Sequence, residues 1–342
     1  MAGERFEYEI RQAKKEDIPM IMEYINEDWR QGHVLSVNRT LFEYEFLEAD
    51  GTVNMAIAIN QDKKCMDGCL GYLKTSYGTE TFDLWGSVWK VRKEAGNLLG
   101  LQLLEYVQNI PGSRYYFGIG MNPNTSVRIH EKLLKEFAGK MRHWYCLAER
   151  SEYQLAVVKQ KDKGLYKAKK VSYETRLLNR QDFTDMFDQI AVDEQELPHK
   201  NKEYFLHRYF LHPIYEYQVY GIFEDQSVKA FFILREDSFQ NRSAIRMVDY
   251  FGDENCMYGI ESVRSELFQR QEVEYLDFYE YGYSQKCLEN AGFCLLQEND
   301  ENIIPNYFGP FVQENIDIWV TSPVKNVKFV KGDGDQDRPN KS

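Results

Sequence analysis

The hydrophobic and polar positions of this chain follow the same order of elements twice. In the first half, apolar residues between positions 15 and 29 recur at three- and four-residue spacing, which predicts an amphipathic helix. Strands are predicted where apolar and polar residues alternate between turn signals. The predicted strands of this half are 7–13, 53–59, 69–75, 82–91, 114–119 and 143–147, and the further helices are 97–108 and 125–137.

The second half repeats this order. Four residues of the opening strand and helix recur at a constant offset: Tyr8, Glu9, Arg11 and Asp17 return as Tyr173, Glu174, Arg176 and Asp182. The predicted strands are 172–178, 217–223, 229–234, 244–250 and 273–280, with helices at 180–189, 257–269 and 284–290. Such self-similarity is typical of a duplicated domain. We therefore expect one domain at residues 1–150 and a second at residues 165–330.

The last residues, 331–342, are expected to form a polar, mobile tail. Their D-x-D-x-D start resembles a calcium loop, but Arg338 stands where that loop needs glycine. The six cysteines form no C-x-x-C pair and no zinc pattern with histidine. We therefore predict no metal.

Composition narrows the classes of function. The 342 residues are 43% hydrophobic and carry a formal net charge of −12. Nucleic acids and anionic membranes select basic surfaces, so neither is the expected partner. No apolar run approaches the ~18 residues that cross a bilayer, and the first residues lack the apolar core of a signal peptide. We therefore predict a cytoplasmic protein without a membrane span.

One strand, loop and helix in the first half carry the pattern most closely tied to chemistry. The strand is predicted to end at Val91, and a loop with Gly96 leads into an apolar helix whose first turn holds Gly100. Backbone N–H groups at a helix start favour anions, and glycines let a phosphate approach. Arg92 and Lys93 add positive charge beside the loop. The alternative is that Gly96 only shapes the turn and Gly100 only permits close packing.

In its context this loop resembles the phosphate loop of the GNAT superfamily of acyl-CoA-dependent acyltransferases. In that family a Q/R-x-x-G-x-G/A loop cradles the CoA pyrophosphate, and here the loop reads A-G-N-L-L-G from Ala95 to Gly100. Gly96 matches the first glycine of the family and Gly100 matches its last small residue. Ala95 replaces the usual Gln or Arg and Leu98 replaces a glycine, which implies a weaker or differently built phosphate grip.

A second landmark is the run P-N-T-S-V-R-I-H-E-K-L at residues 123–133, which resembles the family's N-x-x-A-x-x-L-Y helix. Ser126 stands for the small residue, and His130 stands where the family's tyrosine protonates the departing CoA thiolate. An imidazolium can donate a proton near working pH. A half-buried helix histidine without a chemical role is an equally good interpretation.

The resemblance implies an α/β (α+β) fold of two tandem GNAT-like domains, each a mixed, mainly antiparallel sheet flanked by helices. It implies an N-acetyltransferase that moves an acetyl group from acetyl-CoA to an amine, with an amino sugar, free or nucleotide-linked, of surface polysaccharide synthesis as the expected acceptor. The catalytic residue is then His130, and Trp29 and His33 are the substrate-binding candidates, with a polar loop that binds no substrate as the alternative for these two residues. The cofactor-binding residues are Val91, Arg92, Lys93, Ala95, Gly96, Asn97, Leu98, Leu99, Gly100, Asn124 and Ser126.

The second copy is expected to be non-catalytic. Asp253 and Glu254 stand where the phosphates would lie, and like charges repel there. Leu288 aligns with His130 and cannot transfer a proton. Two alternatives stay open for the whole chain: a non-catalytic binding module that kept the fold, and a Fem-type aminoacyltransferase, against which the acidic balance weighs because tRNA needs a basic face.

Overall fold

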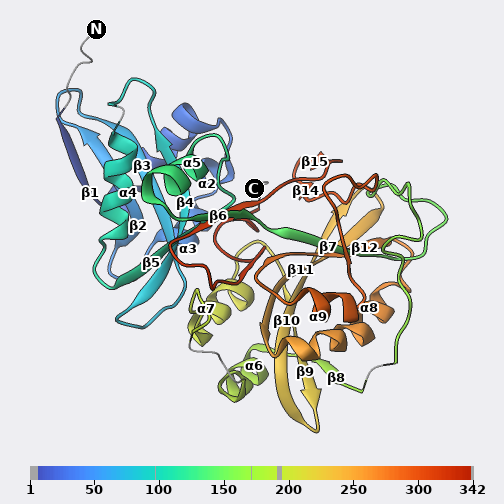
Figure 1. Ribbon diagram of the computed structural model, residues 1–342. Coiled ribbons are helices and arrows are strands. Elements are labelled where there is room, and N and C mark those ends of the chain that lie inside the picture. The colour runs from blue at the N-terminus through green and yellow to red at the C-terminus, as the bar shows by residue number, and fades with distance from the viewer. Residues whose placement is uncertain (1–6, 97, 171, 191–194, 340–342) are drawn as a thin grey trace.

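The computed structural model describes residues 7–96, 98–170, 172–190 and 195–339. Within them the chain forms two mixed sheets (Figure 1). The N-terminal sheet runs β1 (Tyr8–Lys14), β2 (Thr52–Asn60), β3 (Cys65–Lys74), β4 (Phe82–Val91), β5 (Ser113–Ile119), β16 (Trp319–Ser322) and β6 (Phe137–Lys140). The C-terminal sheet runs β8 (Glu174–Leu177), β9 (Gln218–Glu224), β10 (Ser227–Phe239), β11 (Arg242–Gly252), β12 (Val273–Tyr281), β7 (Arg142–Leu147) and β13 (Cys294–Leu295).

The two sheets have the same strand order, and each contains one strand of the other half of the chain. β16 lies between β5 and β6 and pairs antiparallel with both, while β7 lies between β12 and β13 in the same way. In Figure 1 the green β7 accordingly runs beside the orange β12. The expected two-sheet fold is therefore confirmed. The division at 1–150 and 165–330 stays a prediction about the repeats, because strands of both sheets cross it.

Helices cover both faces of the N-terminal sheet, which explains why β2 is almost continuously apolar. Met55 and Ile57 pack against one group of helices, and Ala56 and Ala58 pack against α4 on the other face. α4 is Leu99–Gln108, and the helices of the first group are α1 (Ile18–Tyr24), α2 (Val34–Val37) and α3 (Arg39–Phe46). The sheet is thus buried on both faces, as the alternation of period two requires.

The C-terminal sheet is flanked by α6 (Arg180–Met186), α7 (Lys202–Phe205), α8 (Glu261–Leu267) and α9 (Gln285–Asn290), with a small hairpin of β14 (Tyr307–Phe308) and β15 (Phe311–Val312). One hydrophobic cluster is shared by the two sheets, since it joins Trp85 and Phe117 to Phe205 and Phe231. In the described ranges no helix is long and apolar enough to cross a membrane.

The helix expected at 125–137 is shorter than its pattern predicts. It comprises α5 (Ser126–Arg128) and a π-helical segment, Ile129–Leu134. Lys135 then adopts a left-handed conformation with φ of 61°, which ends the helix and turns the chain into β6. The apolar residues after position 134 therefore belong to a strand.

The prediction of a mobile polar tail is wrong for residues 331–339, which are largely buried. β17 (Phe329–Val330) pairs with β12, and the chain then runs between the two sheets. Asp333 accepts a hydrogen bond from Lys200 (3.1 Å) and Asp337 accepts one from Arg235 (2.7 Å). Composition could not show this burial, because the compensating charges lie far away in the sequence.

Asp337→Asn should test how strongly this segment is held. Burial alone would raise the pKa of the Asp337 carboxyl, but the hydrogen-bonded Arg235 guanidinium lowers that pKa to about 2. The carboxylate therefore stabilises the fold above about pH 4 and loses this effect as the pH falls through about 2. We expect the substitution to lower the free energy of unfolding by ~3–5 kcal/mol at pH 7, with a smaller difference at pH 2.5, measured by urea unfolding.

The matched control is Asp317→Asn. Asp317 also forms an ion pair, with Lys140 at 2.6 Å, but its side chain is 59% exposed. Its substitution should change the free energy of unfolding by less than ~1 kcal/mol. Equal effects of the two substitutions would show that the C-terminal segment does not depend on the Arg235 pair.

Candidate functional site

The site begins where two parallel strands separate. β4 and β5 pair from Phe82 to Trp85 on β4, with a register shift between Phe82 and Leu84, and the last matched pair is Trp85 with Phe117. Beyond it, β5 turns to β16, with Gly118 opposite Thr321. Residues 86–91 of β4 consequently present an edge of backbone N–H and C=O groups that has no β5 partner. Such a fork is a ready place for a ligand that hydrogen-bonds to a strand.

A tyrosine lies in the angle of the fork. A Cβ atom built on Gly86 would lie only 2.0 Å from the hydroxyl oxygen of Tyr116, so the ring packs directly against the backbone of β4. Tyr116 is 4% exposed, and this burial raises the pKa of its hydroxyl group. The absence of a side chain at position 86 therefore lets the tyrosine fill the space between the two strands.

The fork opens into a cleft of about 780 Å³. Its walls come from the β4 residues after the fork, the first turn of α4 at Gly100, the loop at residues 120–126, and the 29–33 segment. The C-terminal segment adds Asp335, Gln336 and Arg338 to the wall, and the β14 strand adds Tyr307. The cleft thus combines residues from both ends of the chain.

The structure brings together five of the residues predicted for the site. They line the cleft from four separate segments: Val91, Gly100, Ser126, Trp29 and His33. The others lie outside its wall: Arg92, Lys93, Ala95, Gly96, Leu98, Leu99, Asn124 and His130. Asn97 falls outside the described residues.

Arg92 illustrates why the loop contributes less than its pattern indicates. Its guanidinium binds the Asp28 carboxylate at 2.6 and 2.9 Å, and this hydrogen bond raises the pKa of Arg92. The charge is thereby compensated within the protein. Leu98, which replaces a family glycine, is 65% exposed.

His130 is buried below the cleft. Its Nδ1 lies 2.6 Å from a carboxylate oxygen of Glu136, and its ring stacks on Tyr116 at 5.7 Å between centroids. Its Nε2 is buried and has no hydrogen-bond partner among the described residues. The role of proton donor stays a prediction, since His130 does not line the cleft.

The two predicted acceptor residues contact each other on the cleft wall. The rings of Trp29 and His33 lie 4.6 Å apart. Burial, together with the charges of Arg338 and Arg30, lowers the pKa of His33 to about 4. Its Nδ1 accepts a hydrogen bond from the Leu35 backbone, so the imidazole is neutral at pH 7 and carries its proton on Nε2.

Sequence reasoning missed the carboxylate of the cleft. Asp335 accepts hydrogen bonds from Ser87 (3.0 Å) and Arg338 (3.0 Å) on one oxygen and from Gln336 (3.0 Å) on the other. Arg338 in turn binds Glu45 at 2.6 Å. No local pattern identifies Asp335, because its polar surroundings are those of a solvated tail.

The C-terminal sheet has the corresponding fork, and the chain itself fills it. β11 and β12 are parallel and stay paired up to Met247 and Phe278. Beyond that point Gly332 donates to the Val248 carbonyl at 2.7 Å and Lys331 donates to the Tyr279 carbonyl at 3.2 Å. The C-terminal segment therefore occupies one fork and then helps to line the other.

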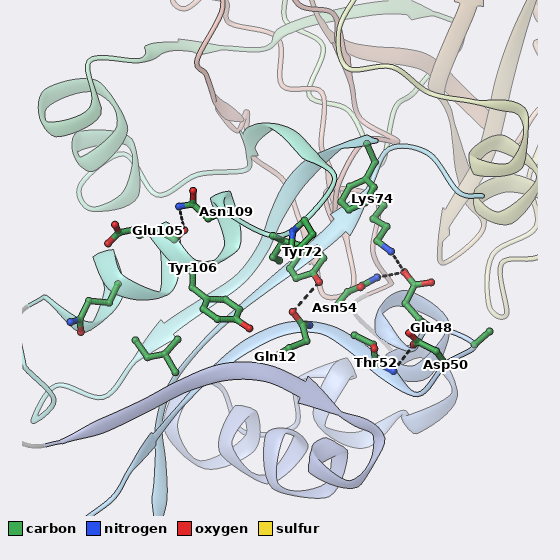
Figure 2. A pocket seen from close by; sticks show the side chains of 16 residues that line it. Gln12, Glu48, Asp50, Thr52, Asn54, Tyr72, Lys74, Glu105, Tyr106 and Asn109 are labelled. Atoms are coloured by element: carbon green, nitrogen blue, oxygen red, sulfur yellow. Dashed lines mark hydrogen bonds and ion pairs between the residues drawn. The ribbon is translucent and has the colours of Figure 1, made fainter. Parts of the chain in front are cut away.

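A separate acidic cavity of about 1100 Å³ lies at the other end of β4, where Phe82 contributes to its wall (Figure 2). Glu48, Asp50 and Glu105 supply its carboxylates, and its Lys74 is bound to Glu48 at 2.8 Å. Anionic phosphates are repelled there. These carboxylates are not grouped to bind one ion, and among the described residues no three or more His, Cys, Asp or Glu side chains are placed so that they could hold a metal ion.

The fold is similar to that of a GCN5-related N-acetyltransferase and of a probable N-acyltransferase, at 11% and 6% sequence identity. No protein-family model matches the chain, and no curated protein matches it. Among solved structures it is similar to a GCN5-related N-acetyltransferase from Anabaena variabilis, with a TM-score of 0.56 and 11% identity over 93% of this chain and 73% of that one. It is also similar to a probable N-acyltransferase of unknown function from Enterococcus faecalis, with a TM-score of 0.52 and 6% identity over 92% and 72%.

Gly86→Ala should show whether the packing of Tyr116 against β4 stabilises the fold at the fork. The added methyl group overlaps the hydroxyl, so we expect a loss of ~1–3 kcal/mol in the free energy of unfolding. In a Tyr116→Ala background the same substitution should cost less, with a coupling of ~0.5–3 kcal/mol. Urea unfolding of the native protein, Gly86→Ala, Tyr116→Ala and the double variant measures this coupling. Gly96→Ala is the control, since no atom lies within 4 Å of its added Cβ. Additive effects of the substitutions at positions 86 and 116 would contradict a direct contact between the Tyr116 ring and the backbone at Gly86.

Proposed function

We propose that this chain is an acyltransferase that moves an acetyl group from acetyl-CoA to an amine. The observation that carries the proposal is the fork between β4 and β5, which opens beside the first turn of α4 into a cleft of about 780 Å³. The likeness of the fold to an N-acetyltransferase and to a probable N-acyltransferase supports it. An amino sugar as the acceptor remains the finer proposal from the sequence.

Acetyl-CoA would lie along the free edge of β4. The first backbone N–H groups of α4 have no partner within the helix, and the helix start favours the pyrophosphate. Gly100 faces the cleft, and its position leaves room for a close approach. The contribution of Arg92 and Lys93 stays a prediction, because Arg92 is bound to Asp28.

The reaction requires one new C–N bond and one broken C–S bond. The amine attacks the thioester carbonyl, and N–H groups on the free edge of β4 stabilise the oxyanion. The amine must lose a proton, and the Asp335 carboxylate, fixed by Ser87 and Arg338, is the base that we propose in the cleft. Glu94, in the loop that follows β4, is exposed and does not line the cleft.

The thiolate must gain a proton. The family resemblance assigns this step to His130, whose imidazole is fully buried in this structure. Water in the cleft is the alternative donor. A non-catalytic binding module is the competing function, and cofactor binding with acyl transfer decides between the two.

Calorimetric titration with acetyl-CoA tests the cofactor. We expect binding with a stoichiometry near one per chain, since the second fork is filled by residues 331 and 332. Gly100→Asp should weaken binding at least about tenfold by placing a charge against the phosphates. Gly100→Asn is the neutral control of equal size and should bind nearly as well as the native protein. Absence of binding by the native protein would remove the enzymatic proposal, and a stoichiometry near two would contradict the filled fork.

Asp335→Asn tests the base. The amide keeps the size of the side chain, so acetyl-CoA affinity should be unchanged while the rate of thiol release with an amine acceptor falls ~10²–10⁴-fold. The residual rate should rise with pH, because the amine then loses its proton to solvent. Glu94→Gln is the matched control and should keep the native rate. Native turnover by Asp335→Asn would exclude Asp335 as the base.

A further inference from the structure

A second cavity adjoins the cleft. It measures about 360 Å³ and lies between β10, the β14 hairpin and the C-terminal segment. Tyr307, Gln336 and Arg338 line both spaces, so the two cavities share a wall and are neighbours.

The cationic side chains that line this cavity differ in whether a carboxylate is paired with them. Arg235 binds Asp337 at 2.7 Å, and Arg338 binds Glu45 at 2.6 Å. Lys331 has no carboxylate within 4.0 Å in the part of the chain that the structure describes. Its ammonium group instead donates to neutral oxygens, Oδ1 of Asn306 at 2.6 Å and the Gln336 carbonyl at 3.5 Å.

Lys331 is 3% exposed, and an ammonium group has three N–H donors, of which two are used here. A buried cation without a paired anion is costly. Burial, followed by the charge of Arg246, accordingly lowers the pKa of Lys331 to about 8. The other groups that face it are Arg235, Asp337 and Asp277, with the Tyr279 ring 5.8 Å from Nζ.

We propose that this cavity binds the carboxylate of the acyl acceptor, with Lys331 as its direct partner. The inference rests on the proposed acyl transfer and narrows its substrate class to amines that also carry a carboxylate. Two sources share this chemistry, an amino acid and a carboxylated amino sugar. The aromatic rings of Tyr215, Tyr307 and Phe308 line the cavity and suit the body of such a ligand.

The arrangement also directs the amine. With its carboxylate at Lys331, the acceptor extends along the shared wall toward Asp335, which lies on the cleft side of the same segment. The anion-binding lysine and the proposed base are thus carried by one stretch of chain.

Calorimetry with matched pairs of small amines tests the proposal. The probes are L-alanine against L-alaninamide, and muramic acid against glucosamine, each titrated into the native protein and into Lys331→Met. The native protein should favour the carboxylated member of at least one pair by about 10- to 100-fold, and Lys331→Met should lose this preference. The pair that shows the preference distinguishes an amino acid from an amino sugar. Thermal unfolding should show Lys331→Met to be at least as stable as the native protein, because a lone buried charge is removed.

A second readout does not depend on affinity. Since a bound carboxylate favours the charged form of Lys331, binding at pH 9 should take up protons, which calorimetry in buffers of different ionisation enthalpy measures. Lys331→Met should show no uptake. Equal affinity for both members of each pair, or the same preference in Lys331→Met, would overturn the assignment.

Acetyl-CoA titration of the same samples separates this inference from the function. Binding of acetyl-CoA without a carboxylate preference would remove the role of Lys331 and leave acyl transfer standing. A preference that depends on Lys331 without acetyl-CoA binding would support the carboxylate site and remove the acyltransferase.

Discussion

The pairing of buried charges along residues 333–338 is the interaction on which the arrangement of the two sheets depends. Asp333 and Asp249 share Lys200, Asp337 binds Arg235, and Arg338 binds Glu45 on α3 of the N-terminal half. Buried ion pairs contribute little net stability compared with apolar groups of the same shape, because desolvation offsets their attraction. Their effect here is positional, since each charge has one place in the fold where its partner lies.

Because these ion pairs fix the path of the C-terminal segment, the two similar sheets differ at their forks. Both sheets contain a parallel pair of strands that separates, β4 with β5 and β11 with β12. The C-terminal segment can enter only one of the forks, and the hydrogen bonds of Gly332 and Lys331 show that it enters the second. The exchange of β7 and β16 supports this choice, because β16 returns the chain to the first sheet before β17 crosses to the second. Duplication thus leaves one open cleft and one filled counterpart.

The order of elements was predictable from local patterns, and the long-range pairings were not. The strand expected at 82–91 matches β4, and the helix expected at 97–108 contains α4, since both have clear periodicity. β16 has only four residues and pairs with strands about 180–200 positions away, as its pairing of Val320 with Ile119 shows. The glycine loop indicated the right helix. However, it could not reveal that Arg92 is bound to Asp28, or that Asp335 belongs to the site.

The tail shows most clearly why composition misleads at a functional position. A run of Asp, Gly, Gln and Arg is normally solvated, and it is buried here only because the cations and anions it meets come from elements that the sequence places far away. Among its described residues, every charged side chain forms an ion pair except Lys331, whose ammonium group donates to neutral oxygens. If stability alone shaped the segment, an apolar side chain would suit position 331 better. A lone buried cation beside an open cleft is therefore most simply explained by an anion that is not part of the chain.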